Sequence, residues 1–195
     1  ERVGLSTPPQ HGKSESMSRG LPVMFMGMFP HLNVILTSYG ADFAQEWGAK
    51  CRDTLLNYGE QIFGVKVNPR SRSSKRFSLL HEVNGQWYPG GKMITAGARG
   101  RITGEGAHLI LIDDPIKNDE QAASPVYQEK IWNWYQATVR SRIRNGTRIL
   151  ITMTRWHESD LLGRLIAESD AGTGEPFKII NLPAIAERDE DWSEW

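Results

Sequence analysis

The chain has 195 residues, of which 39% are hydrophobic and 24% are charged, the composition of an ordinary soluble globular protein with one substantial core. The formal net charge is +0 at pH 7, so bulk charge gives no basis for nucleic-acid or membrane binding, and any such surface must be local. The single cysteine, Cys51, excludes an intramolecular disulfide and a cysteine-built metal site, and the longest apolar run, 23–29, is far too short to span a bilayer.

The first apolar run, 3–5, leads into a segment with the features of a phosphate-binding loop. Gly12 lets backbone N–H groups approach phosphate oxygens, Lys13 reaches the β- and γ-phosphates, and the Ser14 hydroxyl ligates Mg²⁺. The helix that starts here adds its unpaired N–H groups and the positive end of its dipole. The full pattern G-x-x-x-x-G-K-[ST] requires a glycine where this chain has Thr7, so the loop needs a partner motif elsewhere in the chain.

The next part of the chain predicts two helices with a strand between them. Residues 14–19 are compatible with a helix, which Gly20 and Pro22 should end or kink. Residues 33–37 form a buried strand, and beyond it apolar residues recur every four positions, which predicts a helix that ends near Gly59. Core packing explains this apolar stripe more simply than a binding face does; its members are Phe43, Trp47, Cys51 and Leu55.

A basic cluster interleaved with serines precedes a predicted β-hairpin. The cluster suits a phosphate backbone, and it is equally well explained as a solvated loop. The hairpin is indicated by two strand-like runs, 77–83 and 92–96, on either side of the turn residues Asn84-Gly85. The basic residues are Arg70, Arg72, Lys75 and Arg76.

The glycine-rich segment 97–106 is expected to be a mobile loop that carries two arginines to the start of an apolar run. That run, 108–112, is predicted to be a strand buried on both faces, and it ends in Asp113 and Asp114. Buried carboxylates are costly unless they are paired or bound to metal, so these acids indicate a Mg²⁺ site; an Asp-Asp-Pro turn is the alternative. In this order and spacing, the acids and the phosphate loop together favour a nucleotide site.

The remaining elements complete an alternation of strands and helices. Ser124-Pro125 begins a helix, for which Asn145-Gly146 is the expected C-terminal stop. Buried strands are predicted at 148–154 and 177–182, with a helix at 160–168 between them. Such alternation implies a mainly parallel sheet, and ligands bind beyond the carboxyl ends of parallel strands. The residues expected at these ends include Thr7, Asp113 and Arg155.

Three stretches together make the chain similar to the ATPase domain of tailed-phage terminase large subunits. They are 8–15, which contains Gly-Lys-Ser; 103–117, which contains the acidic strand; and 152–161, which reads Thr-Met-Thr-Arg-Trp-His-Glu-Ser-Asp-Leu. The resemblance implies an α/β fold of the three-layer P-loop NTPase type, with a mainly parallel sheet, helices on both faces and a β-hairpin insertion. It also implies that 1–186 are an ATPase domain without the upstream segment that contacts adenine, and that 187–195 begin a linker towards a nuclease domain outside these residues.

The resemblance also assigns roles to individual residues. Lys13 and Ser14 hold the phosphates and Mg²⁺. Asp113 holds Mg²⁺ through water, and Asp114 polarises the attacking water. The motif that couples hydrolysis to movement contains Thr152 and Thr154. The full nucleotide-binding set is Pro9, Gln10, His11, Gly12, Lys13, Ser14 and Glu15.

The chain departs from the family pattern at two positions. Family members often carry an arginine inside the phosphate loop, where this chain has Gln10, and their catalytic residue is usually glutamate, where this chain has the shorter Asp114. Because an arginine at the γ-phosphate contributes strongly to phosphoryl transfer, the missing charge is expected from elsewhere. We favour Arg101 in the glycine-rich loop, acting on its own site or on a neighbouring subunit; Arg99 and Arg155 are further candidates. A solvated loop arginine is the alternative interpretation.

The implied function is that of an ATP-hydrolysing motor that moves double-stranded DNA into a procapsid, with ATP and Mg²⁺ as cofactors. The implied partners are double-stranded DNA, the portal protein, the small terminase subunit and further copies of the chain in a ring, in the host cytoplasm and transiently at the procapsid portal, without a membrane. No nuclease activity is expected, because the remaining acids gather in 187–194, most simply a solvated linker. The alternatives are a helicase-like P-loop ATPase, against which Thr-Arg-Trp-His argues, and a prophage remnant that binds nucleotide without turnover.

Overall fold

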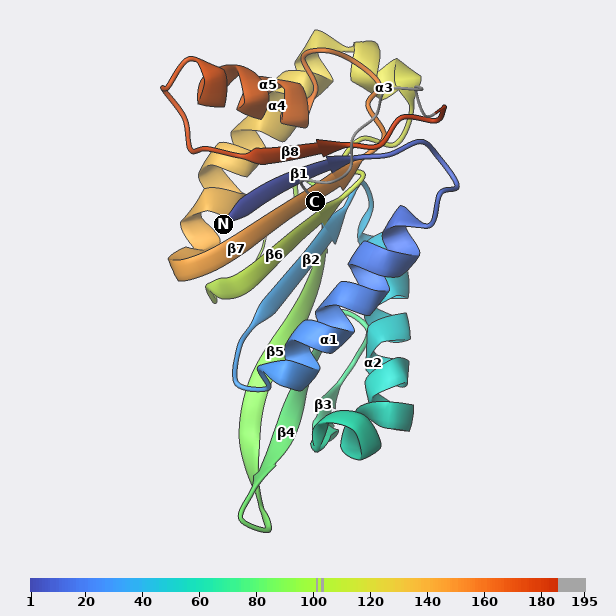
Figure 1. The fold of residues 1–195 in the computed structure, drawn as a ribbon, viewed down its shortest axis with the longest axis vertical. Helices are drawn as coiled ribbons and strands as arrows, with labels where there is room; N and C mark the ends of the chain where they lie inside the picture. Colours follow the sequence, from blue (N-terminus) through green and yellow to red (C-terminus); the bar gives the residue numbers. More distant parts are fainter. Residues whose placement is uncertain (101, 103, 186–195) are drawn as a thin grey trace.

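The computed structural model describes residues 1–100, 102 and 104–185, which form a single sheet with helices on both faces (Figure 1). Eight strands lie in the order β3-β4-β5-β2-β6-β7-β1-β8. Only the β3–β4 and β4–β5 pairs are antiparallel among the described strands, so the mainly parallel α/β fold is confirmed. The strands are β1 (Arg2–Ser6), β2 (Val34–Ser38), β3 (Val65–Arg72), β4 (Arg76–Val83), β5 (Gln86–Gly97), β6 (Ala107–Asp113), β7 (Ile143–Met153) and β8 (Lys178–Asn181).

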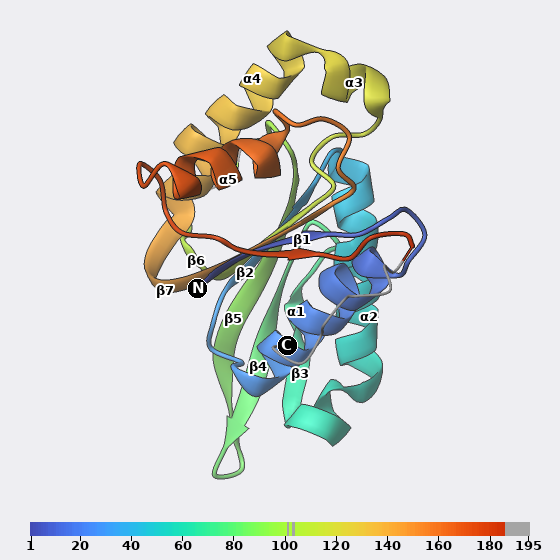
Figure 2. The ribbon, with the colours of Figure 1, turned by 45° about the horizontal axis from the view of Figure 1, so that its top comes forward.

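The helices cover the two faces of the sheet in separate groups (Figure 2). One face carries η1 (Glu15–Gly20), α1 (Leu21–Met28) and α2 (Ala41–Phe63). The other carries α3 (Asp119–Ala123), α4 (Pro125–Trp134), η2 (Tyr135–Val139), η3 (Arg140–Arg142) and α5 (Leu161–Asp170). None of the described helices is long and apolar enough to cross a membrane.

Each central strand supplies both cores, because successive side chains of a strand point to opposite faces. Ile35 and Ile110 lie in the core beneath α4 and α5, whereas Leu36 and Leu111 lie in the core beneath α1 and α2. This double burial explains why these strands read as unbroken apolar runs. The stripe on α2 contributes to the second core, as expected; its residues Trp47, Cys51 and Leu55 are buried.

The sequence predicts that Gly20 and Pro22 end or kink the first helix, and the helical segment does not end there. Instead η1 is wound as a π-helix, in which the Leu21 N–H donates to the Ser16 carbonyl, and the chain continues directly into α1. Pro22 lies in the first turn of α1, where a missing N–H is tolerated. The wider winding therefore absorbs the two helix-breaking residues within a continuous helical segment.

The second helix runs further than predicted and ends at Gly64 instead of near Gly59. Gly64 has a φ angle of 65°, and its N–H donates to the Glu60 carbonyl, which makes it the C-cap. Gly59 lies inside the helix, and a side chain there would meet the Val65 carbonyl oxygen at 3.0 Å. Gly59 thus allows close packing and does not stop the helix.

Asn145-Gly146 is not a helix stop, because it lies within β7, after the helical segment has ended at Arg142. The register between β6 and β7 shifts there, since Ala107 faces Ile143 while Leu109 faces Arg148. Thr147 bridges this bulge: its hydroxyl donates to the Ala107 carbonyl at 2.7 Å and accepts from the Arg144 N–H at 2.7 Å. The turn-forming residues therefore mark a bulge.

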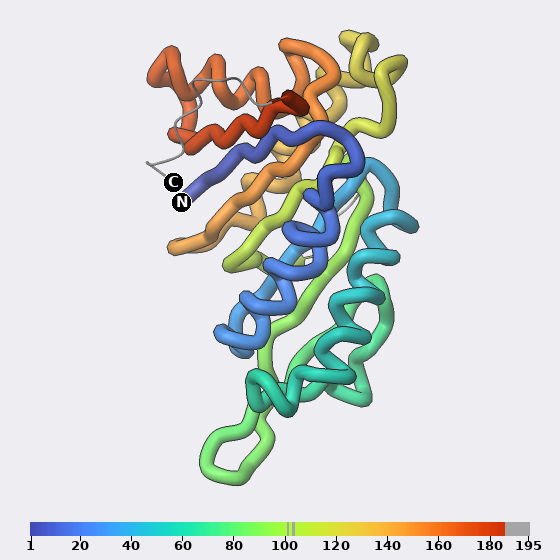
Figure 3. Tube along the Cα trace, turned by 45° about the vertical axis from the view of Figure 1, so that its right-hand side comes forward, coloured from blue at the N-terminus to red at the C-terminus, as the bar shows by residue number. Residues whose placement is uncertain are grey.

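The predicted β-hairpin is present as β4 and β5, and its tip extends away from the rest of the sheet (Figure 3). Asn84 and Gly85 both have positive φ angles, 52° and 80°, as a two-residue hairpin turn requires. The basic cluster adjoins this hairpin, with Arg70 and Arg72 in β3, Arg76 at the start of β4 and Lys75 in the turn between them. Three of the four residues thus lie in strands, and Lys75 lies in the connecting turn.

Two further predictions concern the C-terminal part of the chain. The strand predicted at 177–182 exists as β8, but it is an edge strand with only partly buried central residues, Ile179 and Ile180. The predicted linker, 187–195, lies outside the described residues, so the domain boundary after 186 stays a prediction.

Candidate functional site

The strand register brings the carboxyl ends of the central strands to one edge of the sheet. Ser38, at the end of β2, pairs with Gly97 of β5 and with Asp113 of β6. Asp113 pairs in turn with Thr152 of β7, which pairs with Leu5 near the end of β1. The residues that follow β1, β6 and β7 therefore share one edge, where the sequence predicts the nucleotide site.

The phosphate loop, residues 7–14, connects β1 to η1 at this edge. Gln10 and Gly12 have positive φ angles of 62° and 75°, and left-handed residues of this kind occur in loops whose N–H groups bind anions. The Ser16 N–H donates to the Gly12 carbonyl at 3.0 Å, which closes the first helical turn. Ser14 occupies the N-cap position, and its hydroxyl makes no capping hydrogen bond, so that oxygen is suited to a metal ligand.

The other residues of the predicted nucleotide-binding set lie on the solvent side of this loop. Pro9 and His11 are exposed, and the His11 Nδ1 lies 2.8 Å from the Pro9 carbonyl oxygen. Glu15, in the first turn of η1, forms an ion pair with Arg19 one turn later. A ligand can therefore approach the loop from solvent.

Lys13, Asp114 and Thr154 come together from three segments that are distant in the sequence. The Lys13 Nζ lies 2.6 Å from the Asp114 Oδ2 and donates to the Thr154 Oγ1 at 2.9 Å. The Thr154 N–H donates to the Asp114 Oδ1 at 2.8 Å. Each of the three residues thus contacts the other two, which links the phosphate loop to the ends of β6 and β7.

Asp114 has a backbone conformation that few non-glycine residues adopt. Its φ angle is 43°, and conformations of this kind cost about 1–3 kcal/mol and concentrate at functional sites. The surrounding backbone fixes it: its N–H donates to the Thr152 carbonyl at 2.8 Å, and its carbonyl accepts from the Tyr39 N–H at 3.0 Å. These backbone hydrogen bonds therefore orient the Asp114 carboxylate towards the phosphate loop.

The electrostatic surroundings of Asp114 suit a proton acceptor. Burial raises the pKa of its carboxyl group above the usual value, and the hydrogen bonds from Lys13 and the Thr154 N–H oppose that rise. A general base works best when its pKa lies near the working pH. The direction of the shift is thus the one that general-base chemistry needs.

Asp113 is fully buried, and both of its carboxylate oxygens accept a hydrogen bond from a hydroxyl group. Ser18 Oγ donates to Oδ2 at 2.9 Å, and Thr152 Oγ1 donates to Oδ1 at 2.8 Å. Each carboxylate oxygen has two lone pairs, so each keeps one for a water molecule.

The oxygen atoms available as metal ligands at this edge fit Mg²⁺. Ser14 and Asp113 offer oxygen atoms, and Mg²⁺ prefers one or two such protein ligands together with waters and substrate phosphates. The part of the chain that the structure describes contains no cluster of three or more His, Cys, Asp or Glu side chains able to hold a metal by themselves. The residues present therefore suit a nucleotide-bound metal and not a dedicated protein cage.

The candidate arginines have separate surroundings. Arg155 Nε donates at 2.8 Å to Asp160, a buried carboxylate that also accepts from the Gly163 N–H at 2.9 Å as the N-cap of α5. The Arg99 guanidinium lies over the Tyr127 ring, 5.0 Å from its centroid. Arg101 lies outside the described residues.

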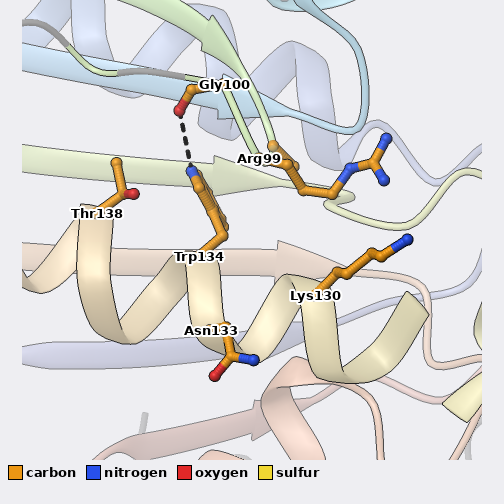
Figure 4. A pocket seen from close by; sticks show the side chains of 7 residues that line it. Arg99, Gly100, Lys130, Asn133, Trp134 and Thr138 are labelled. Atoms are coloured by element: carbon orange, nitrogen blue, oxygen red, sulfur yellow. Dashed lines mark hydrogen bonds between the residues drawn. The ribbon is translucent and has the colours of Figure 1, made fainter. Parts of the chain in front are cut away.

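A hollow of about 680 Å³ lies between the start of the glycine-rich segment and α4 (Figure 4). Arg99 and Lys130 extend their side chains toward the same end of it. The Trp134 Nε1–H donates to the Gly100 carbonyl at 3.3 Å. These contacts hold the first residues of the glycine-rich segment, which the sequence predicts to be mobile, against α4.

The sequence-based interpretation omitted one residue that contacts the site, Ser18. It lies four residues after Ser14, which places both on one side of a helix, and this spacing was the available signal. The spacing does not show that the Ser18 hydroxyl donates to Asp113, because that contact joins η1 to a strand 95 positions later in the sequence.

Comparisons with known proteins agree with this fold. A family model described as terminase large subunit, T4likevirus-type, N-terminal, matches residues 5–193. The large terminase of a thermophilic bacteriophage has a TM-score of 0.53 at 11% identity, over 93% of this chain and 39% of that chain. The complex of that phage protein with ATP-γ-S has a TM-score of 0.52 at 11% identity, over 93% of this chain and 38% of that one.

A mutant of the ATPase domain of the Thermus phage P74-26 large terminase has a TM-score of 0.51 at 18% identity, over 93% of this chain and 75% of that chain. A search of curated proteins gave no match. At these identities the structural likeness shows a shared fold, and the chain spans 39% of the thermophilic phage protein. Since the family model covers almost all of the sequence, the chain belongs to the T4-like virus type of terminase large subunits, to the family of their N-terminal part.

Proposed function

We propose that this chain binds ATP with Mg²⁺ at the carboxyl edge of its sheet and hydrolyses it to move double-stranded DNA. The observation that carries the proposal is the mutual contact of Lys13, Asp114 and Thr154. It unites a phosphate-binding cation, a candidate general base and the residue that follows the neighbouring strand β7 in one cluster. Two structures of one relative, the large terminase of the thermophilic phage, support the choice of nucleotide, since one is a complex with ATP-γ-S and the other a complex with ADP.

In this proposal Lys13 links nucleotide binding to the freeing of Asp114, the candidate general base, from its ion pair. Its ammonium group neutralises the Asp114 carboxylate at 2.6 Å. Phosphate oxygens that draw this ammonium away leave Asp114 with its hydrogen bond from the Thr154 N–H and a free oxygen, Oδ2. That oxygen then orients a water molecule and accepts its proton. Mg²⁺ would supply charge neutralisation on the phosphates when bound, and Ser14 would hold it directly and Asp113 through water.

The end of β7, with Thr152, and the segment after it, with Thr154, are suited to pass a change in the site to α5. Thr152 contacts Asp113, and Thr154 contacts both Lys13 and Asp114. The next residue, Arg155, holds Asp160 at the N-terminus of α5. A change in the Lys13 contacts thus reaches a helix on the opposite face of the sheet through two consecutive residues.

The proposed setting is a packaging motor in the host cytoplasm, transiently at the procapsid portal. Double-stranded DNA is the substrate, and the portal protein, the small terminase subunit and further copies of the chain in a ring are the partners.

A direct experiment is phosphate release from Mg²⁺–ATP with and without double-stranded DNA. A motor releases phosphate faster when DNA is present, whereas a remnant binds nucleotide and releases none. Stimulation by single-stranded nucleic acid alone indicates the helicase-like alternative.

The basic turn (Arg70, Arg72 and Lys75) is the surface we propose for the DNA backbone. It lies at the same carboxyl edge of the sheet as the phosphate loop, because Arg76 pairs with Ile94 near the end of β5. The turn is firmly placed, since the Thr95 N–H donates to the Lys75 carbonyl at 3.0 Å and the Thr95 hydroxyl donates to the Ser74 carbonyl at 3.2 Å. All three basic side chains are exposed, and none forms an ion pair with a carboxylate of the described residues.

Replacing the three residues of the basic turn with alanine is expected to weaken DNA binding and its salt dependence. Each lost phosphate contact reduces the slope of log K against log salt by about 0.9, so the triple variant should lose up to about 3 from the slope. The measurement is a DNA-binding titration at several salt concentrations. The matched control replaces three exposed arginines of the opposite edge, Arg140, Arg144 and Arg148. Equal losses in both triple variants contradict a specific role for the basic turn.

A further inference from the structure

Ser18 is a buried hydroxyl residue whose contacts the proposed function does not yet use. Its exposed fraction is 1%, equal to that of Asp113, to which it donates at 2.9 Å. The second hydroxyl on Asp113 comes from Thr152 and reaches the other carboxylate oxygen. Asp113 is thus held at both oxygens by groups that have a single proton to donate.

The backbone carbonyl of Ser18 also takes part in a hydrogen bond. Pro22 has no N–H group, so the Ser18 carbonyl lacks the donor that an α-helix would supply four residues later. The Cys51 thiol supplies it instead, with Sγ 3.2 Å from the Ser18 carbonyl oxygen. Burial raises the pKa of Cys51 to about 12, which keeps the thiol protonated and able to donate.

Ser18, which contacts the acidic strand, lies in the π-helical segment η1. In this π-helix the Leu21 N–H reaches back to the Ser16 carbonyl, and single π-helical turns within helices occur frequently at functional sites. The segment joins the phosphate loop at one end and α1 at the other. Ser18 therefore ties the helix that follows the phosphate loop to the strand that carries Asp113.

We propose that Ser18 is a positioning residue, which fixes the Asp113 carboxylate in the orientation that holds the hydrated Mg²⁺ of the nucleotide. The inference rests on the proposed function, because it requires Asp113 to serve the metal. Without the Ser18 hydroxyl, Oδ2 of Asp113 loses its only hydrogen-bond donor among the described side chains, and the carboxylate is held by Thr152 alone. Residues that orient metal-binding carboxylates typically change metal affinity by about 10–100-fold when they are replaced.

The test compares Ser18→Ala with Ser16→Ala in the full chain, using a fluorescent ATP analogue and a titration of Mg²⁺. Both changes remove one hydroxyl from η1, but Ser16 is exposed and Ser18 is buried. We expect the Mg²⁺ concentration at half-saturation to rise roughly tenfold in Ser18→Ala, near the low end of that range, and to stay unchanged in Ser16→Ala. Binding of the analogue in EDTA should be the same in both variants and in the wild type.

Three results overturn the inference. They are an unchanged Mg²⁺ titration in Ser18→Ala, an equal loss of binding with and without Mg²⁺, and equal effects in the two serine variants. If Ser18→Ala does not fold, Ser18→Cys takes its place, since it leaves no cavity and replaces the hydroxyl with a weaker donor. Failure of the proposed function looks different, because the wild type itself then shows no Mg²⁺-dependent binding.

Discussion

Asp114→Asn is expected to slow ATP hydrolysis by about 10²–10⁴-fold while ATP affinity stays close to that of the wild type, because it removes a general base and leaves the phosphate loop intact. The asparagine side chain still accepts from the Thr154 N–H, which donates to the Asp114 Oδ1 at 2.8 Å. It cannot accept a proton from water at neutral pH. Single-turnover phosphate release, together with analogue binding, measures the two effects separately.

The matched variant is Asp113→Asn, one residue earlier, at the last position of β6. The Asp113 carboxylate accepts hydrogen bonds from the hydroxyl groups of Ser18 and Thr152. Among the described residues, Lys13 forms its ion pair with Asp114 and not with Asp113. Loss of the Asp113 charge should therefore weaken Mg²⁺-dependent binding first. Equal binding defects in the two variants contradict the division of roles between the acids.

Arg101→Ala is expected to lower DNA-stimulated turnover of the assembled protein by about 10³–10⁵-fold and to spare ATP binding, because an arginine at the γ-phosphate stabilises the transition state. Gln10 is neutral and cannot supply this charge. The isolated chain should accordingly bind ATP and hydrolyse it slowly. Steady-state phosphate release at saturating ATP is the measurement.

Arg99→Ala and Arg155→Ala are the comparison variants for this prediction. Arg99 lies over Tyr127, whereas Arg155 is the ion-pair partner of the buried Asp160. Arg155→Ala should therefore lower the melting temperature, because a buried carboxylate loses its countercharge. Rapid turnover of the isolated chain that none of the three variants affects contradicts the proposed source of the charge.

The sequence predicts where a candidate site residue lies if that residue follows an apolar strand. Asp113, Asp114 and Thr154 follow or end runs that can only be buried strands, and parallel strands bring such ends to one edge. The contact of Lys13 with Thr154 at 2.9 Å could not be derived in this way. It requires β7 to lie between β1 and β6, and strand order is not encoded in local periodicity.

Helix boundaries were less predictable, because tertiary contacts override the local signals of glycine and proline. Gly20 and Pro22 are accommodated by π-helical winding and by a thiol from α2. Asn145-Gly146 has the chemistry of a turn, but a bulge in β7 uses it. Ser18 was missed because its contact with Asp113 joins η1 to a strand 95 positions later in the sequence.

The most direct measurement of the proposed ATP site is the affinity of a fluorescent ATP analogue for wild type and Lys13→Ala in the presence of Mg²⁺. Loss of a charge-assisted contact of about 1.5–3 kcal/mol predicts an affinity roughly tenfold to more than a hundredfold weaker. Lys66→Ala is the control, because Lys66 lies on β3, several strands from the phosphate loop, and pairs with Glu60 of α2. Equal affinity of the wild type and Lys13→Ala would contradict the assignment of residues 7–14 as a phosphate-binding loop.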